Sequence, residues 1–141
     1  MKILLAVDGS KFTKKMLAYL VTHTEMFSQV GNRFVVFTAS PPVPSRARAA
    51  LGTAVVKQYY DEEAEKILAP VCKFLQRHGI HPKSAHELGA AGDAIAKMAE
   101  QGDFDLLVMG SHGHGALGSL MMGSVAARVL AQCKVPMLLV R

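Results

Sequence analysis

The sequence has few cysteines and no long apolar run, which are features of proteins from oxidising compartments and membranes. Of its 141 residues, two are cysteine, none is tryptophan and 19% are charged. Cys72 and Cys133 are too few for a disulfide framework and form no CxxC pair, so we expect reduced core residues. No apolar run reaches the roughly 18 residues of a membrane span, and residues 3–7 are shorter than the apolar part of a secretory signal. We therefore expect a cytoplasmic protein that associates with no membrane.

Charge of either sign is also scarce and only slightly unbalanced. Sixteen Lys and Arg residues against eleven Asp and Glu residues leave a formal net charge of +5. Since no dense basic run accompanies this excess, we expect no binding to nucleic acid. Half of the residues are apolar, which excludes a disordered or fibrous chain. The length suits a single domain over residues 1–141, with a core that needs no disulfide or metal.

Short apolar segments alternate with longer segments of helical periodicity. Each type of segment is recognised by the spacing of its apolar residues. Strands are predicted at residues 3–7, 33–39, 83–88, 106–109 and 135–140. Helices are predicted near residues 12–21, 55–78, 94–99 and 124–132, with Ser10 as the cap of the first. This alternation predicts an α/β fold, in which one open, twisted, five-stranded parallel sheet carries helices on both faces.

Prolines interrupt this pattern in two places. Residues 40–52 contain three of them, Pro41, Pro42 and Pro44, and the segment is interpreted as a mobile connector. Pro70 falls inside the helix predicted over residues 55–78. Because proline has no N–H to donate, we expect Pro70 to kink or interrupt that helix.

The glycine-rich segment before the last helix gives the strongest functional signal. Residues 110–124 read GSHGHGALGSLMMGS and contain five glycines. A connection of about a dozen residues is longer than the roughly two to six usual between a strand and a helix. The segment follows the carboxyl end of a predicted strand, and ligands of open α/β sheets bind beyond the carboxyl ends of the strands. Glycine backbone and the free N–H groups of a following helix together predict a phosphate site, to which the hydroxyls of Ser111 and Ser124 could donate.

Several other motifs are excluded by their context. Residues 113–118 fit GxGxxG, but they follow the fourth strand rather than the first, which argues against a dinucleotide site. Residues 118–124 resemble a P-loop that lacks its lysine, which argues against a Walker-type NTPase. His112 and His114 have no nearby cysteine or carboxylate, so we expect no metal site in the protein. No nucleophile with a base and an orienting group is visible, and no catalytic residue is assigned.

Another glycine pattern fits the segment of residues 110–124 better than GxGxxG or a P-loop does. Gly110, Gly113, Gly123 and Ser124 match the spacing G-x2-G-x9-G-[S/T]. With VDGS at residues 7–10, DLLVMGSHG at 105–113 and VPMLLV at 135–140, the whole chain resembles the ATP-binding type of the universal stress protein family. The resemblance implies a Rossmann-like fold of the adenine nucleotide alpha hydrolase type, with strand order 3-2-1-4-5.

The resemblance also implies a set of site residues. Asp8 would approach the ribose or adenine, and the backbone of Thr38 or Ala39 would meet the adenine. The phosphate loop would comprise four motif residues: Gly110, Gly113, Gly123 and Ser124. Ser111 and Val125, which flank them, would also contact phosphates. The implied ligand is ATP, or ADP or AMP, accompanied by Mg²⁺ or Mn²⁺. Where many members carry a basic residue, this chain has His114, so phosphate binding would rest on N–H groups, hydroxyls and protonated histidines.

We therefore interpret the chain as an adenine-nucleotide-binding regulatory module of the stress response rather than an enzyme. A slow ATPase or a nucleotidyl or phosphoryl transferase using the same site is one alternative. A protein-interaction subunit that has lost nucleotide binding is another. Residues 135–140 would leave an unpaired apolar edge, so we expect a homodimer through that strand, in addition to a protein partner that the sequence does not name.

Overall fold

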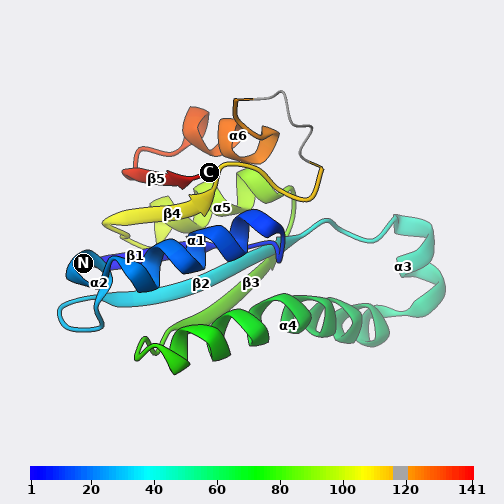
Figure 1. The fold of residues 1–141 in the computed structure, drawn as a ribbon. Coiled ribbons are helices and arrows are strands. Elements are labelled where there is room, and N and C mark those ends of the chain that lie inside the picture. The colour runs from blue at the N-terminus through cyan, green and yellow to red at the C-terminus, as the bar shows by residue number, and fades with distance from the viewer. Residues whose placement is uncertain (116–120) are drawn as a thin grey trace.

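A five-stranded parallel sheet runs through the middle of the molecule (Figure 1). The computed structural model describes residues 1–115 and 121–141. Its strands are β1 (Lys2–Ala6), β2 (Arg33–Ser40), β3 (Lys83–Leu88), β4 (Leu106–Gly110) and β5 (Met137–Val140). They are ordered β3-β2-β1-β4-β5 and every neighbouring pair is parallel. This confirms the predicted α/β fold and strand order. Because β1 has β2 on one side and β4 on the other, the strand order reverses at β1, where such sheets bind ligands.

Helices cover both faces of the sheet and bury the two sides of β1. Ile3 and Leu5 pack with helices α1 (Lys11–Thr22) and α4 (Thr53–Arg77) on one face. Leu4 and Ala6 pack with helices α5 (Ala91–Gln101) and α6 (Ser124–Gln132) on the other. Successive side chains of a strand point to opposite faces, so a strand buried on both faces needs a continuous apolar run.

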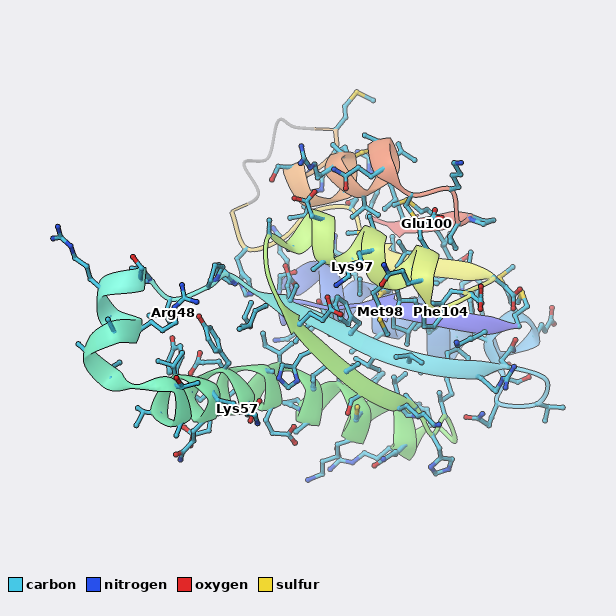
Figure 2. All side chains as sticks on the ribbon, turned by 180° about the vertical axis from the view of Figure 1, so that it is seen from behind. Arg48, Lys57, Lys97, Met98, Glu100 and Phe104 are labelled. Atoms are coloured by element: carbon cyan, nitrogen blue, oxygen red, sulfur yellow. The ribbon has the colours of Figure 1, made fainter. Side chains whose placement is uncertain are left out.

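The segment predicted as a mobile connector contains a helix, so that prediction was wrong. Helix α3 spans Ser45–Leu51 and follows Pro44, which occupies its N-cap position. All three prolines precede the helix, and its own residues are largely good helix formers such as alanine and arginine. The helix buries no residue. Figures 1 and 2 show α3, with Arg48, standing apart from the sheet and from α5.

Pro70 does not interrupt its helix. Helix α4 continues from Thr53 to Arg77 with Pro70 inside it, and the proline ring is exposed. A proline in the helix interior loses one hydrogen bond, but packing of the neighbouring face offsets that loss. Here Leu68, Val71 and Leu75 are buried around the proline and hold the helix on the sheet.

Smaller differences concern the element ends and one short helix. The last strand begins at Met137 rather than at residue 135. Helix α2 (Thr24–Phe27) is an additional turn of helix that periodicity over four residues could not reveal. In the described part of the chain, no helix combines the length and the hydropathy needed to cross a bilayer.

Candidate functional site

A cavity of about 300 Å³ opens at the carboxyl edge of the sheet, beside the ends of β1 and β4. Its volume lies at the lower end of the range for small-molecule sites. Its apolar lining side chains, several of them small, include the following: Ala6, Val7, Ala39, Ala91, Ile95, Met109 and Ala126. Short apolar side chains leave room for a flat ring and exclude water from it. Polar groups enter the cavity from the β1–α1 junction and from the glycine-rich loop.

Asp8, two residues beyond the end of β1, is held by a local hydrogen-bond network. The Thr13 hydroxyl and the Ser10 N–H both donate to Asp8 Oδ1, each at 2.9 Å. The Asp8 N–H donates in turn to Thr13 Oγ1 at 3.1 Å. The Ser10 hydroxyl caps α1 as predicted, because it accepts from the first N–H groups of that helix. These bonds fix the carboxylate and leave Oδ2 on the side of the glycine-rich loop, near Gly113.

Three of the motif glycines are required by close packing. A β-carbon on Gly113 would lie 2.8 Å from Asp8 Oδ2. One on Gly110 would lie 2.6 Å from the β-carbon of Phe12, and one on Gly123 would lie 2.9 Å from His112 Cα. None of the four described glycines of the loop has a positive φ. The motif therefore lets the loop lie against the start of α1 and against itself, and it is not needed here for a left-handed turn.

Helices α5 and α6 both begin at the cavity without a side-chain cap from any described residue. Gly123 is the N-cap of α6, and Ser124 is its first residue rather than its cap. Ala90 is the N-cap of α5. Ser124 and Val125 of α6 and Ala91 of α5 line the cavity. The first N–H groups of a helix have no partner within it and carry a partial positive charge, so this arrangement can bind an anion.

A polar clasp on the surface holds these two helices together. Asp93 of α5 accepts from Arg128 Nε at 2.8 Å and from Gln132 Nε2 at 2.9 Å, both on α6. These hydrogen bonds, first that of Arg128, lower the pKa of the Asp93 carboxyl. A β-carbon on Gly92 would lie 2.6 Å from Arg128 Cγ, so the helices approach closely. The clasp links the first turn of α5 to α6 on the surface of the molecule.

Two histidines of the loop complete the lining. His114 Nε2 lies 2.7 Å from the carbonyl oxygen of Asp8. His112 Nδ1 lies 2.9 Å from Ser111 Oγ, and its ring centroid is 5.0 Å from that of Phe12. Both histidines therefore connect the loop to the β1–α1 junction, and they bring ionisable groups to the same cavity as Asp8.

The structure brings most of the predicted site residues together. Seven of the nine line the cavity: Asp8, Ala39, Gly110, Gly113, Gly123, Ser124 and Val125. Thr38 is 2% exposed and lies outside the lining, while Ala39 beside it points toward α5. Ser111 is also 2% exposed, and its hydroxyl is engaged with His112. Gly118, part of the two excluded loop motifs, lies outside the described residues.

Sequence reasoning missed other lining residues. The Thr13 hydroxyl donates a hydrogen bond to the Asp8 carboxylate. In the sequence, this role is indicated only by the position of Thr13 in the first turn of a helix that begins beside Asp8. Ala91 and Ile95 enter because α5 begins at the cavity, and no local motif marks such apolar residues. His112 and His114 were weighed as metal ligands and as charged partners of a phosphate, but neither was placed among the predicted site residues. The described residues contain no group of three histidine, cysteine, aspartate or glutamate side chains that could hold a metal ion.

Comparison with known proteins relates the chain to one family. The model of the universal stress protein family matches residues 1–141. The "Universal stress protein in QAH/OAS sulfhydrylase 3'region" of Thermus aquaticus is 35% identical over 140 residues. That alignment covers 99% of this chain and 97% of the Thermus protein.

Solved structures show the same fold. The protein MJ0577 of Methanocaldococcus jannaschii superposes with a TM-score of 0.80 at 24% identity, covering 99% of this chain and 94% of the other. A universal stress protein of Archaeoglobus fulgidus, solved in complex with dAMP, superposes with a TM-score of 0.70 at 19% identity. The second alignment covers 100% of this chain and 98% of the Archaeoglobus chain.

Proposed function

Because the chain belongs to the universal stress protein family, we propose that it binds an adenine nucleotide and acts as a regulatory module of the stress response. One observation carries the proposal: a mainly apolar cavity adjoins the uncapped N-terminus of α6 and a closely packed glycine loop. An apolar pocket beside free N–H groups suits a ligand with a flat base at one end and phosphate at the other. The Archaeoglobus relative, solved with dAMP, supports adenine nucleotides as the ligand class.

Within the proposed complex, each part of the nucleotide has a matching part of the cavity. The base would occupy the apolar side, where Ala39 and Ile95 line the cavity. Asp8, with Oδ1 already bonded, would offer its other oxygen to ribose hydroxyls. The phosphates would lie at the first N–H groups of α6, beside Ser124 and Val125.

Mg²⁺ or Mn²⁺ would enter with the nucleotide. The described residues offer no cluster of three potential ligand side chains, so the phosphate oxygens themselves would supply most of the coordination. Mg²⁺ commonly binds in this way, through substrate phosphates and retained water. The metal's role would be to neutralise phosphate charge.

The proposed unit is a homodimer of single-domain chains of residues 1–141. Strand β5 forms one edge of the sheet, with β4 on its inner side. Pairing of two such edges around a two-fold axis would satisfy their outward backbone groups. A regulatory module of this kind would act on a further protein.

Calorimetric titration with ATP, ADP and AMP in the presence of Mg²⁺ tests the proposal. We expect saturable binding of one nucleotide per chain, and little or no ATP turnover in the same samples. Gly113→Val should abolish binding, because the added side chain would collide with the Asp8 carboxylate. Absence of any binding at millimolar ATP would reject the proposal, and turnover abolished by Gly113→Val would indicate the enzyme alternative.

A further inference from the structure

The ionisable groups of the cavity are few, and two of the three are imidazoles. Among the described residues that line it, Asp8, His112 and His114 have ionisable side chains, and none is lysine or arginine. A phosphate chain bound there would meet backbone N–H groups and imidazoles instead of a permanent cation. The positive charge available to it therefore depends on whether the imidazoles carry a second proton.

His114 lies between the loop and the end of β1 in a defined orientation. Its Nε2 atom is 2.7 Å from the carbonyl oxygen of Asp8. A carbonyl oxygen can only accept, so Nε2 carries the hydrogen and donates it. Nδ1 of the same ring is then the nitrogen that takes up a second proton. With that proton the ring becomes a cation with a new donor, while its bond to Asp8 is kept.

His112 brings a second imidazole to the same lining, with Nδ1 2.9 Å from Ser111 Oγ. Its ring centroid is 5.0 Å from that of Phe12 on α1. Lys11 and Lys15 lie over the Phe12 ring, each ammonium 5.3 Å from the ring centroid. Both lysines are exposed, so their field at the cavity is screened over about 8 Å at physiological ionic strength.

The remaining charged groups near the two histidines come from three elements. Asp8 faces them from the end of β1, with Oδ2 beside Gly113, the residue between the histidines. Asp93 of α5 and Arg128 of α6 neutralise each other in the surface clasp and do not line the cavity. Protonation of an imidazole therefore changes the charge inside the cavity itself.

We infer that His114, assisted by His112, determines recognition of the phosphate chain, so that binding of a nucleoside triphosphate is coupled to proton uptake by the cavity. The inference rests on the proposed nucleotide-binding function. Imidazole is the side chain that ordinarily changes charge between about pH 5 and pH 8. Hydrogen bonds from a charged donor to phosphate are roughly twice as strong as neutral ones. Affinity for ATP therefore rises as the pH falls through this range, whereas affinity for adenosine stays constant.

Titration of the full chain with Mg-ATP, AMP and adenosine at about pH 6 and about pH 8 tests the inference. We expect ATP to bind about tenfold more tightly at the lower pH, AMP to show a smaller change and adenosine none. As the pH falls, the phosphates of the nucleotide can only lose negative charge, which opposes the expected change. A tightening at low pH therefore has to come from the protein.

Two substitutions of His114 separate charge from shape. His114→Arg supplies a permanent cation, so ATP should bind tightly at both pH values. His114→Gln keeps a donor for the Asp8 carbonyl but cannot be charged, so ATP should bind weakly at both. His81→Gln is the matched control, because His81 is an exposed histidine just before β3, at the opposite edge of the sheet, and it should keep the wild-type pH dependence.

The outcomes distinguish this inference from the proposed function. Equal ATP affinity at the two pH values in a protein that binds ATP and adenosine would overturn the inference alone. The same holds if His114→Arg retains the wild-type pH dependence. Failure of adenosine, AMP and ATP alike to bind would reject the nucleotide site itself.

Discussion

At Gly113 the absence of a side chain lets the loop lie directly against the Asp8 carboxylate. A β-carbon there would be 2.8 Å from Asp8 Oδ2, closer than real β-carbon contacts allow. Two residues later, a β-carbon on Gly115 would meet no atom of the described residues within 4 Å, and Gly115 has no positive φ. The two glycines share a loop but differ in what a methyl group would meet, which makes them a matched pair.

Gly113→Ala should weaken adenine nucleotide binding by at least tenfold, because the methyl group displaces either the loop or the Asp8 carboxylate, and about 1.4 kcal/mol suffices for that factor. Gly115→Ala should weaken binding far less, because no atom of the described residues lies within 4 Å of its added methyl group. Calorimetry gives the affinities, and the melting temperature shows whether each variant folds. Wild-type affinity in Gly113→Ala would mean that Asp8 and the loop are not parts of one site.

The Thr13 hydroxyl both accepts from the Asp8 N–H and donates to the Asp8 carboxylate. Thr13→Val keeps the shape but leaves the N–H of Asp8 without its partner, so we expect a loss of about 1–3 kcal/mol in the free energy of unfolding. Urea denaturation measures it. Thr22→Val, at the exposed end of the same helix, is the control and should change stability little. Equal stability of Thr13→Val and the wild type would show that water replaces the hydroxyl.

At the residue scale, the sequence predicts the parts of the site that have a recognisable motif. Gly110, Gly113 and Gly123 stand at a spacing that marks a loop, and Asp8 ends an apolar run. Thr13 could not be predicted in the same way, because its importance depends on a hydrogen bond formed only in the folded junction. The choice between Thr38 and Ala39 was also open, since it depends on which face of β2 meets the cavity.

Among the helices, the clasp between α5 and α6 joins two elements whose uncapped N-termini adjoin the cavity. Arg128 and Gln132 donate to Asp93, and this lowers the pKa of its carboxyl. A carboxyl whose pKa is lower in the folded state stabilises the fold above the pKa of the unfolded chain, about 4. That stabilisation is lost as the pH falls through the folded value.

Asp93→Asn should therefore lower the melting temperature slightly at neutral pH and have no such effect in strong acid. The group is exposed, so the difference should also shrink with added salt. Melting curves recorded from neutral to acidic pH measure it. Glu25→Gln, a change at a carboxylate without an ion pair to a described residue, is the control. A difference that does not vary with pH would show that the clasp acts through packing alone.

Helices were predicted correctly where the helical spacing of apolar residues extends over several turns. Strands were predicted correctly where both of their faces are buried. Strand β3 and helix α6 have the predicted bounds, whereas α3 was missed because three prolines before it dominated the interpretation. Pro70 was likewise given too much weight as an interruption of α4. Its local cost is visible in the sequence, but the tertiary packing of Leu68, Val71 and Leu75 that offsets it is not.

For the whole molecule, the outer edge of β5 is the feature that bears on assembly. The N–H groups of Leu107 and Ser111 donate to the carbonyls of Pro136 and Val140, each at 2.9 Å. Backbone groups of a strand alternate in direction, so those of Met137 and Leu139 face away from β4. These outward groups are the ones that a second copy would pair.

Sedimentation should show a dimer at micromolar concentration, and Leu139→Pro should convert it to a monomer. Proline removes an outward donor and leaves the bonds between β4 and β5 in place, as it can in an edge strand. Circular dichroism checks that the variant stays folded. A wild-type chain that sediments as a monomer would contradict assembly through this edge.

Charge is distributed over the molecule in a way that the net value of +5 does not reveal. The glycine-rich loop of residues 110–124 contains no lysine or arginine, and Lys11, Lys14 and Lys15 stand instead in the first turns of α1. An anion in the cavity would therefore be held by helix N-termini and imidazoles. The three lysines are exposed, so dissolved salt screens their attraction for that anion.

We propose that an adenine nucleotide occupies the cavity at the carboxyl edge of the sheet. Amide chemical shifts of the isotope-labelled chain, recorded during titration with AMP, test it most directly. We expect saturable shifts centred on Asp8, Ala39 and residues 110–115 and 123–126. Saturable shifts confined to another part of the molecule, such as α3 and the start of α4, or no shift at millimolar AMP, would contradict it.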